Sequence, residues 1–285
     1  GLSLERAGNV DLDLFWQLAS NSVEIRTSAA KKLTLSLAEA ASAHEGEGIC
    51  PDLSYSLKRL VRGLASSRDG AREGFCIALI QVLRTRKEID PIELFNLMLD
   101  QLQVPKGSTS QEEKECHFGR LFACRSFIQA GLCTITPKAA KRALKESAHE
   151  ELLSWKVMQE LLRLHKIKSY MSEACLDTLV RLLRLVPDDL FTAAFAPRLD
   201  ELWKDAEPPT LHPDLLHVYL VVEQRRNPGR TPPALQASRL PLLADTLKVS
   251  SAAHPRVHGI WTTLFTAILQ GYAAAADGGG GGEAA

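Results

Sequence analysis

Long apolar runs are absent from this 285-residue sequence, and neither sign of charge is in excess. No uninterrupted apolar stretch approaches the roughly 18 residues that a bilayer-spanning helix needs, so we expect no transmembrane segment and no membrane partner. Lys and Arg number 34 together, and so do Asp and Glu. This balance leaves no overall field that would attract nucleic acid or anionic lipid, so any such contact must come from a local cluster of charges.

Signals for secretion are missing as well. The opening residues, GLSLER, lack the charged region and the apolar region of a signal peptide. The six cysteines are scattered, mostly in apolar helical stretches such as GFCIAL at residues 74–79, which is typical of reduced thiols in a core. We therefore expect a reduced intracellular compartment.

Motifs of the common enzyme classes are also absent. The sequence has no GxxxxGK[ST] phosphate loop, no GxGxxG turn opening a helix and no GxSxG nucleophile turn. The cysteines form no CxxC pair, which argues against a zinc site. These absences predict a protein without a cofactor, a metal or a small-molecule substrate.

Two tight pairs of aspartates are the places where a two-metal carboxylate site would be sought, Asp11 with Asp13 and Asp188 with Asp189. Both pairs stand where a helix is expected to begin. Aspartate at a helix start caps backbone amides and complements the helix dipole. We therefore predict capping rather than catalysis at both pairs, and we predict no catalytic residue elsewhere.

The pattern that is present is helical. Apolar residues recur at three- and four-residue steps along most of the chain, and sustained alternation of apolar and polar residues is missing. Prolines, glycines and polar clusters divide the pattern into segments. The predicted helices cover residues 12–19, 23–43, 54–65, 71–86, 91–102, 112–130, 137–148, 151–165, 172–186, 188–203, 214–225, 233–249 and 255–272.

The spacing of these helices indicates an architecture. Each apolar stripe is too narrow for a free-standing core, and consecutive helix pairs take about 40 residues, as in HEAT and armadillo repeats. We predict an all-α, HEAT- or armadillo-like solenoid of antiparallel helix pairs over residues 1–272, with a compact helical bundle as the alternative. The Gly- and Ala-rich residues 273–285 are expected to form a low-complexity tail or linker.

One local cluster of basic residues suggests a binding surface. This cluster, called the basic ridge below, consists of Lys58, Arg59, Arg62, Arg68 and Arg72. Residues four apart share a helical face, so the members pair up on the two helices that flank a turn and could contact phosphates or a partner protein. The alternative is a set of solvated side chains, because acidic neighbours partly neutralise the ridge and no aromatic residues interleave the charges.

Four tryptophans lie in separate predicted helices, Trp16, Trp155, Trp203 and Trp261. Each has apolar neighbours, so we expect them to pack in the core rather than to bind a ligand.

Three motifs resemble a known family. Residues 53–72, LSYSLKRLVRGLASSRDGAR, resemble the N-terminal signature of the Myb-binding protein 1A family, also called DNA polymerase V or DNA polymerase phi. Residues 13–19, DLFWQLA, resemble its opening FFWDLA segment, and residues 118–131, FGRLFACRSFIQAG, resemble its FGRLFGLLALIQSG helix. The motifs stand in the family's order, and the resemblance covers the N-terminal portion of a longer protein.

The resemblance implies a nucleolar α-solenoid protein involved in ribosomal RNA production, ribosome assembly and transcriptional co-regulation through protein contacts. It offers no catalytic residues to transfer, and the polymerase in the family's name has no support in these residues.

Three functions therefore follow as hypotheses. The first is a non-enzymatic scaffold in the nucleus and nucleolus, with proteins of pre-ribosomal or transcription-regulatory assemblies as partners. The second is direct binding of rDNA or rRNA through the basic ridge, which must weaken as salt rises. The third, a nucleotidyl-transfer enzyme, rests on the family's name alone.

Overall fold

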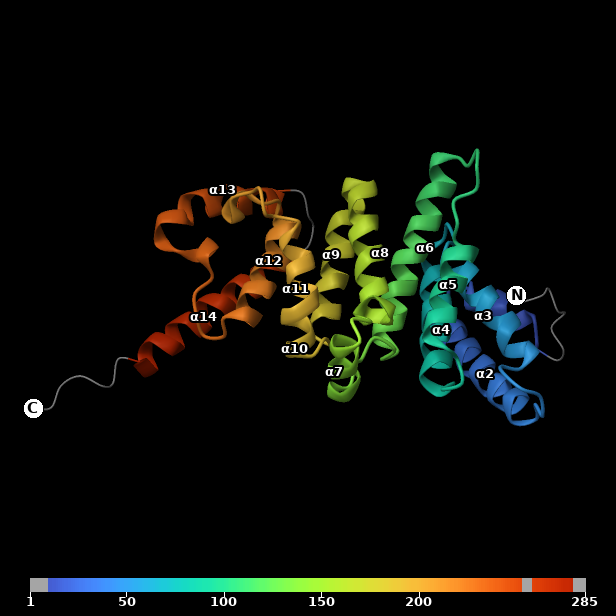
Figure 1. Cartoon of the computed structure of the whole chain (residues 1–285). Coiled ribbons are helices and arrows are strands. Elements are labelled where there is room, and N and C mark those ends of the chain that lie inside the picture. The colour runs from blue at the N-terminus through green and yellow to red at the C-terminus, as the bar shows by residue number, and fades with distance from the viewer. Residues whose placement is uncertain (1–9, 253–257, 279–285) are drawn as a thin grey trace, which may run out of the picture. The chain divides into compact units, whose positions relative to one another are not determined.

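The structure is a computed structural model that describes residues 10–252 and 258–278. Every regular element within these ranges is a helix, which confirms the all-α prediction (Figure 1). The chain divides into two compact units, Gly1–Thr134 with Leu152–Val157, and Ile135–Glu151 with Met158–Ala285. The segment that we expected to form one domain therefore contains two units, and the solenoid arrangement stays a prediction.

The first unit contains helices that pack on their second neighbours in sequence. Helix α2 packs against α4, α4 against α6 and α3 against α5, while α1 lies against α2. Each helix thus buries its apolar stripe against helices before and after it. The bounds are α1 Asp13–Leu18, α2 Val23–Ser42, α3 Pro51–Gly63, α4 Asp69–Thr85, α5 Pro91–Gln101 and α6 Ser110–Gln129.

Helix starts in this unit follow from local sequence. The Ser22 hydroxyl accepts a hydrogen bond from the Ile25 N–H at 3.2 Å, which caps α2. The Asp90 carboxylate accepts from the N–H groups of Ile92 and Glu93, both at 2.8 Å, and a proline occupies the first position of α5. These caps explain why the predicted helix starts lie close to the observed ones.

A glycine allows α4 to approach the end of α1. A Cβ atom at Gly74 would lie 2.0 Å from the carbonyl oxygen of Leu18, so only a residue without a side chain fits. Beside this contact, the buried guanidinium of Arg26 donates to the Ser20 carbonyl at 3.0 Å and pairs with Glu73 of α4. Close backbone packing and an ion pair with a buried guanidinium therefore fix α1, α2 and α4 together.

The second unit contains α-helices of unequal length joined by loops and short 3-10 turns. Helix α12 packs against α9 and α14, which are distant in sequence, and also against its neighbour α13. The helices are α7 Pro137–Lys145, α8 Leu153–Ile167, whose first residues belong to the first unit, α9 Ser169–Leu183, α10 Asp188–Leu190, α11 Ala196–Asp200, α12 Pro213–Arg226, α13 Leu240–Ala252 and α14 Ile260–Gly278. Short 3-10 turns occupy His149–Glu151, Pro208–Thr210, Pro233–Leu235 and Ala237–Arg239.

A buried polar network connects α12 to α14. The Nδ1 atom of His258 accepts from the Ile260 N–H at 3.0 Å, so Nε2 carries the proton and donates to Asp214 at 2.9 Å. The Nε2 atom of His217 lies 2.9 Å from the Thr263 hydroxyl. Burial is the main cause that lowers the pKa of His217 to about 4, so its ring is neutral at pH 7.

The helix predicted over residues 188–203 is interrupted. A π-helical turn at Phe191–Phe195 separates α10 from α11, and the helix ends at Asp200. Pro197 stands in the first turn of α11. Proline has no N–H to donate, and its ring displaces the carbonyl of the preceding turn, which explains the widened turn before it.

Two predictions near the C-terminus require correction. The helix expected from residue 233 begins only at Leu240, because the prolines there favour 3-10 turns. The last helix begins at Ile260, while the first residues of its expected range, 255–257, lie outside the described residues. Helix α14 continues to Gly278, so residues 273–278 are helical rather than part of a tail. The remaining residues of that expected tail, 279–285, also lie outside the described part.

The tryptophan prediction is only partly right. Trp155 and Trp203 are buried, whereas Trp261 is half-buried. Trp16 is 72% exposed, so its assignment to the core is wrong. Helix α1 has only six residues, and it directs its neighbour Phe15 into the core, which leaves Trp16 on the outer face.

Candidate functional site

The structure divides the basic ridge between two helices and two grooves. Lys58, Arg59 and Arg62 lie on α3 and line one groove, whereas Arg72 lies in the first turns of α4 and lines another. Arg68 precedes α4 and lines neither groove. Lys58 and Arg62 line the same groove from α3, whereas Arg68 and Arg72 share no groove, so the five side chains do not form one continuous surface.

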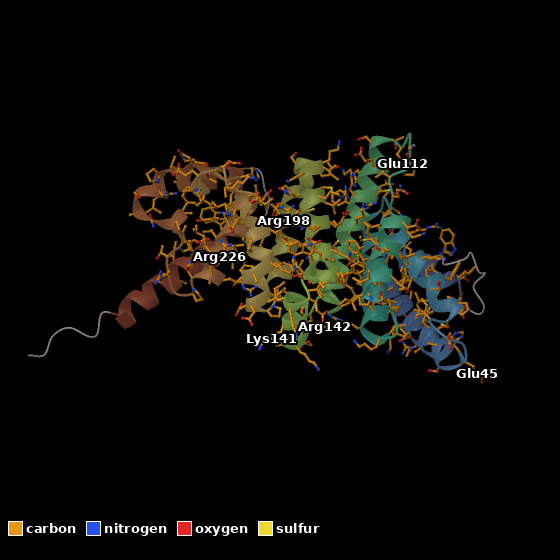
Figure 2. All side chains as sticks on the ribbon, in the orientation of Figure 1. Glu45, Glu112, Lys141, Arg142, Arg198 and Arg226 are labelled. Atoms are coloured by element: carbon orange, nitrogen blue, oxygen red, sulfur yellow. The ribbon has the colours of Figure 1, made fainter. Side chains whose placement is uncertain are left out.

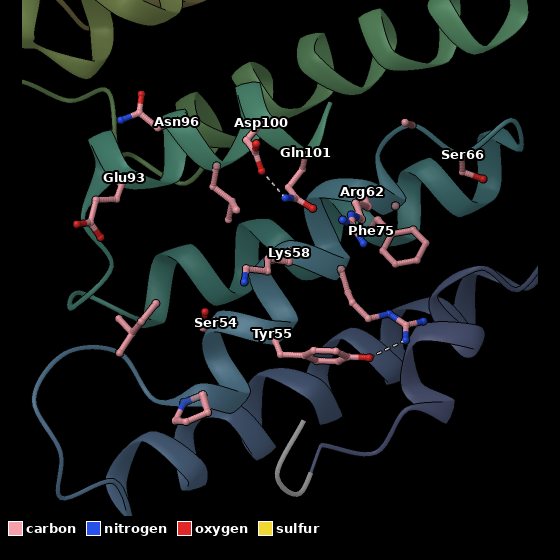
Figure 3. A pocket seen from close by; sticks show the side chains of 16 residues that line it. Ser54, Tyr55, Lys58, Arg62, Ser66, Phe75, Glu93, Asn96, Asp100 and Gln101 are labelled. Carbon is pink, nitrogen blue, oxygen red and sulfur yellow. Dashed lines mark hydrogen bonds between the residues drawn. The ribbon is translucent and has the colours of Figure 1, made fainter. Parts of the chain in front are cut away.

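The larger groove, called the α3/α5 groove below, lies in the first unit and has a volume of about 1350 Å³ (Figure 3). Side chains of α3 form one wall and side chains of α5 form the other. The lining residues are Ile49, Pro51, Ser54, Tyr55, Lys58, Arg59, Arg62, Gly63, Ala65, Ser66, Phe75, Glu93, Asn96, Leu97, Asp100 and Gln101.

The α3 wall is basic, but its three cations have different roles. The Arg59 guanidinium donates to the Tyr55 hydroxyl at 3.0 Å and lies 4.7 Å from the centre of the Phe15 ring. The cation–π contact holds Arg59 against α1, and the hydrogen bond to Arg59 holds the Tyr55 hydroxyl (Figure 3). Lys58 is half-buried and Arg62 is exposed, and both line the groove.

The α5 wall is acidic and polar. Glu93, Asn96 and Asp100 follow a three- and then a four-residue step, which places them on one face of α5, and all three are exposed. Gln101 donates through Nε2 to Asp100 at 2.7 Å (Figure 3). Two carboxylates therefore face a groove whose opposite wall carries cations.

Apolar side chains line the space between the walls. Tyr55 and Phe75 are half-buried, and Leu97 is buried. A Cβ atom at Gly63 would lie 2.3 Å from ring carbons of Phe75, so the glycine makes room for this ring beside the end of α3. The groove thus combines two charged rims with an aromatic and aliphatic floor.

The smaller groove, about 380 Å³, lies between α4 and α6. Arg72 belongs to it, but its guanidinium donates to the Ser66 carbonyl at 2.7 Å, pairs with Asp69 and lies 5.7 Å from the Phe118 ring centre. Arg72 is therefore already bonded to its own loop. Cys76 lines the same groove, and burial raises the pKa of its thiol to about 11, so it is not a thiolate at neutral pH.

The aspartate pairs have structural roles. Asp11 accepts from the N–H of Asp13, the first residue of α1, at 2.9 Å, although Leu12 rather than Asp11 occupies the N-cap position. Asp188 makes no side-chain cap and instead pairs with Arg225 of α12, whose guanidinium lies 4.0 Å from the Phe191 ring centre. The capping prediction is therefore wrong at Asp188, because a long-range ion pair takes its carboxylate. Within the described ranges, no group of three or more His, Cys, Asp or Glu side chains is placed to hold a metal ion.

Sequence reasoning missed the acidic wall of the α3/α5 groove. The signal was present, since Glu93, Asn96 and Asp100 are polar residues on one face of a helix. What the sequence lacked was the pairing of α3 with α5, which are separated along the chain by α4. The floor residue Phe75 was missed for the same reason.

Together, the fold and the groove define an all-helical protein with a mixed-charge binding groove. No described helix is long and apolar enough to cross a bilayer. The chain belongs to the DNA polymerase phi family, because the model of that family matches residues 55–278. This match confirms the resemblance to that family, and it includes the motif at residues 118–131 and nearly all of the motif at residues 53–72, whereas residues 13–19 precede it.

Named relatives agree with this assignment. The rDNA transcriptional regulator pol5 of Schizosaccharomyces pombe is 30% identical over 187 residues, covering 66% of this chain and 17% of its own length. The rDNA transcriptional regulator POL5 of Saccharomyces cerevisiae is 25% identical, covering 90% of this chain and 29% of its own length. Mouse Myb-binding protein 1A is 25% identical, covering 87% of this chain and 17% of its own length. These relatives are named as regulators or binding proteins rather than as enzymes, and the chain spans less than a third of their length.

A likeness to one solved structure is much weaker. An engineered protein aligns over 94% of this chain with 14% identity and a TM-score of 0.30, which is too low to support an argument about the fold.

Proposed function

We propose that this chain is a non-enzymatic scaffold that supports rDNA transcription and ribosome biogenesis in the nucleolus by docking other proteins. The observation that carries the proposal is the α3/α5 groove, which is large, apolar at its floor and charged at both rims, in a chain related to rDNA regulators. Such surfaces bind partner segments through a desolvated centre and polar edges.

The helix packing supports the solenoid form of this scaffold. In the first unit, α2, α4 and α6 pack in succession, and α3 packs on α5. Contacts between second neighbours are what stacked helical pairs make in repeat proteins. Solenoids of this kind bind partners along extended surfaces.

A cellular replacement experiment tests the proposal. In cells that depend on the full-length protein, changing Lys58 and Arg62 to Glu should reduce synthesis of the rRNA precursor, measured by pulse labelling. A matched control changes Lys138 and Lys141 to Glu on α7, where both side chains are exposed. Figure 2 labels Lys141 on this helix. A tagged wild-type protein should concentrate in nucleoli. Precursor synthesis that is equal in wild type and in both variants contradicts the scaffold role of the groove.

Direct binding of rDNA or rRNA is the second candidate function. Arg62 and Arg68 are exposed, and neither makes an ion pair with a residue that the structure describes. In a salt-titrated assay with a labelled RNA or DNA duplex, this hypothesis requires affinity that falls with salt and falls further in Arg62→Glu/Arg68→Glu. Affinity unchanged by the two charge reversals rules out the ridge as a nucleic-acid site.

A further inference from the structure

The size of the α3/α5 groove indicates what class of ligand it holds. Pockets for small molecules measure roughly 300–1,000 Å³. The groove, at about 1350 Å³, exceeds this range and is open along its length between two helices. Its dimensions therefore suit a stretch of polymer rather than a metabolite.

The charges of the two walls distinguish between polymers. Lys58 and Arg62 line one wall, and Glu93 and Asp100 line the other. A nucleic acid carries phosphates on every residue, so a strand attracted by α3 would bring the same negative charge toward the α5 carboxylates. A polypeptide can present acidic side chains to one wall and basic side chains to the other. The groove is therefore complementary to a protein segment.

Hydrogen bonding favours a helical segment over an extended one. An extended chain must find partners for its own N–H and C=O groups. Few lining side chains can both donate to a C=O and accept from an N–H. Three of these, Gln101, Tyr55 and Ser66, already bond to Asp100, Arg59 and the Arg68 N–H, and the others are Asn96 and Ser54. A helix satisfies its backbone internally and needs only side-chain contacts.

The spacing along the walls also suits a helix. Lys58 and Arg62 are four residues apart on α3, as are Asn96 and Asp100 on α5, which corresponds to about 6 Å along each axis. Side chains on one face of a bound helix recur at the same interval. Its apolar stripe would then meet the floor formed around Tyr55.

We propose that the α3/α5 groove binds an amphipathic helix of a partner protein, with acidic side chains toward Lys58 and Arg62 and basic side chains toward Glu93 and Asp100. The inference rests on the proposed function, since it names the kind of segment that the scaffold docks.

A displayed peptide library tests the inference with the purified chain. The library contains helical peptides of about five turns with one apolar stripe, and with Glu or Lys allowed at every flanking position. The wild-type chain should enrich peptides that have Glu along one flank and Lys along the other. Enriched peptides with a central proline should lose binding, because proline breaks the helix.

Charge reversal of each wall gives opposite outcomes. Lys58→Glu/Arg62→Glu makes both walls acidic and should enrich peptides with Lys on both flanks. Glu93→Lys/Asp100→Lys makes both walls basic and should enrich peptides with Glu on both flanks. Each double variant should bind the peptides selected by the wild-type chain about tenfold more weakly, because a single exposed ion pair contributes only a modest binding free energy. The Lys138→Glu/Lys141→Glu control should bind them as tightly as wild type.

Several results would overturn the inference. The first two are that the wild-type chain enriches no helix, or that the wild-type chain and both double variants enrich the same peptides. The others are that the proline-containing peptides bind as tightly as the selected ones, or that a short RNA displaces the selected peptides at physiological salt. Circular dichroism of each variant checks that it folds, and the single change Arg62→Glu at an exposed position serves if a double variant does not. If no helical peptide binds while Lys58→Glu/Arg62→Glu still lowers rRNA precursor synthesis, the proposed scaffold function stands and the inference that the groove binds a helix is wrong.

Discussion

Single residues set the closest contacts in this protein, and Gly74 is the clearest case. Its missing side chain lets α4 reach the carbonyl of Leu18, which is backbone and has no rotamer to move. Gly63 serves Phe75 in the same way beside the candidate groove. Sequence inspection shows glycines inside two apolar helices but not what each one faces, so these roles required the structure.

We predict that Gly74→Ala destabilises the first unit by about 1 to 3 kcal/mol or more, the range for overpacked cores. Chemical denaturation of the purified chain measures the loss. The matched control is Gly70→Ala in the same helix, where the nearest atom to a new Cβ, 3.3 Å away, belongs to the end of the Arg26 side chain. The control should lose far less stability, and equal losses in both variants would refute the steric role of Gly74.

A second residue-scale prediction concerns pH. The pKa of His217 is lowered to about 4 by burial, so between pH 6.5 and 4 the unfolded chain binds a proton that the folded chain does not. Stability contributed by the neutral ring is therefore complete above pH 6.5 and is lost as the pH falls toward 4, by about 2 to 3 kcal/mol.

Denaturation midpoints measured across this pH window test the assignment. His217→Gln should flatten the pH dependence. Other buried groups also contribute to the pH dependence. Burial lowers the pKa of His165 as well, so this residue adds to the loss of stability in the same pH window. The pKa of Asp214 is lowered through its hydrogen bond to His258, and its contribution is lost only below about pH 4. A wild-type profile that is flat between pH 6.5 and 4 would show that His217 is not held neutral.

At the scale of elements, local sequence determines most helix starts. Thr109 accepts from the Glu112 N–H at 3.2 Å while the Glu112 carboxylate accepts from the Thr109 N–H at 2.8 Å, a complete capping box for α6. The predicted start at residue 112 was therefore close to the observed one. The π-helical turn at Phe191–Phe195 was not predictable in this way, because it depends on how the chain around Pro197 packs.

Thr109→Ala should destabilise the first unit by about 1 kcal/mol, as loss of an N-cap does, whereas Thr109→Ser should be nearly neutral. Thermal denaturation followed by circular dichroism compares the two. A serine variant as unstable as the alanine variant would show that the hydroxyl is not the stabilising group.

At the scale of the whole molecule, the predicted solenoid leads to a measurable shape. Small-angle scattering of the purified chain should give a radius of gyration well above the value of about 19 Å expected for a compact domain of this length. A radius near the compact value would favour the helical-bundle alternative and would remove the extended binding surface.

The sequence by itself determined the helical class, most helix positions and the family, because these depend on periodicity, on capping residues and on motifs that are local in the chain. It also located the basic side of the candidate groove on α3. Only the tertiary structure decided that α5 supplies an acidic wall opposite Lys58 and Arg62, that Arg59 and Arg72 are bonded to aromatic rings and neighbouring groups, and that Trp16 is exposed. The physical reason is that each of these facts depends on which helices pack together, and the apolar stripes that drive this packing do not identify their partners.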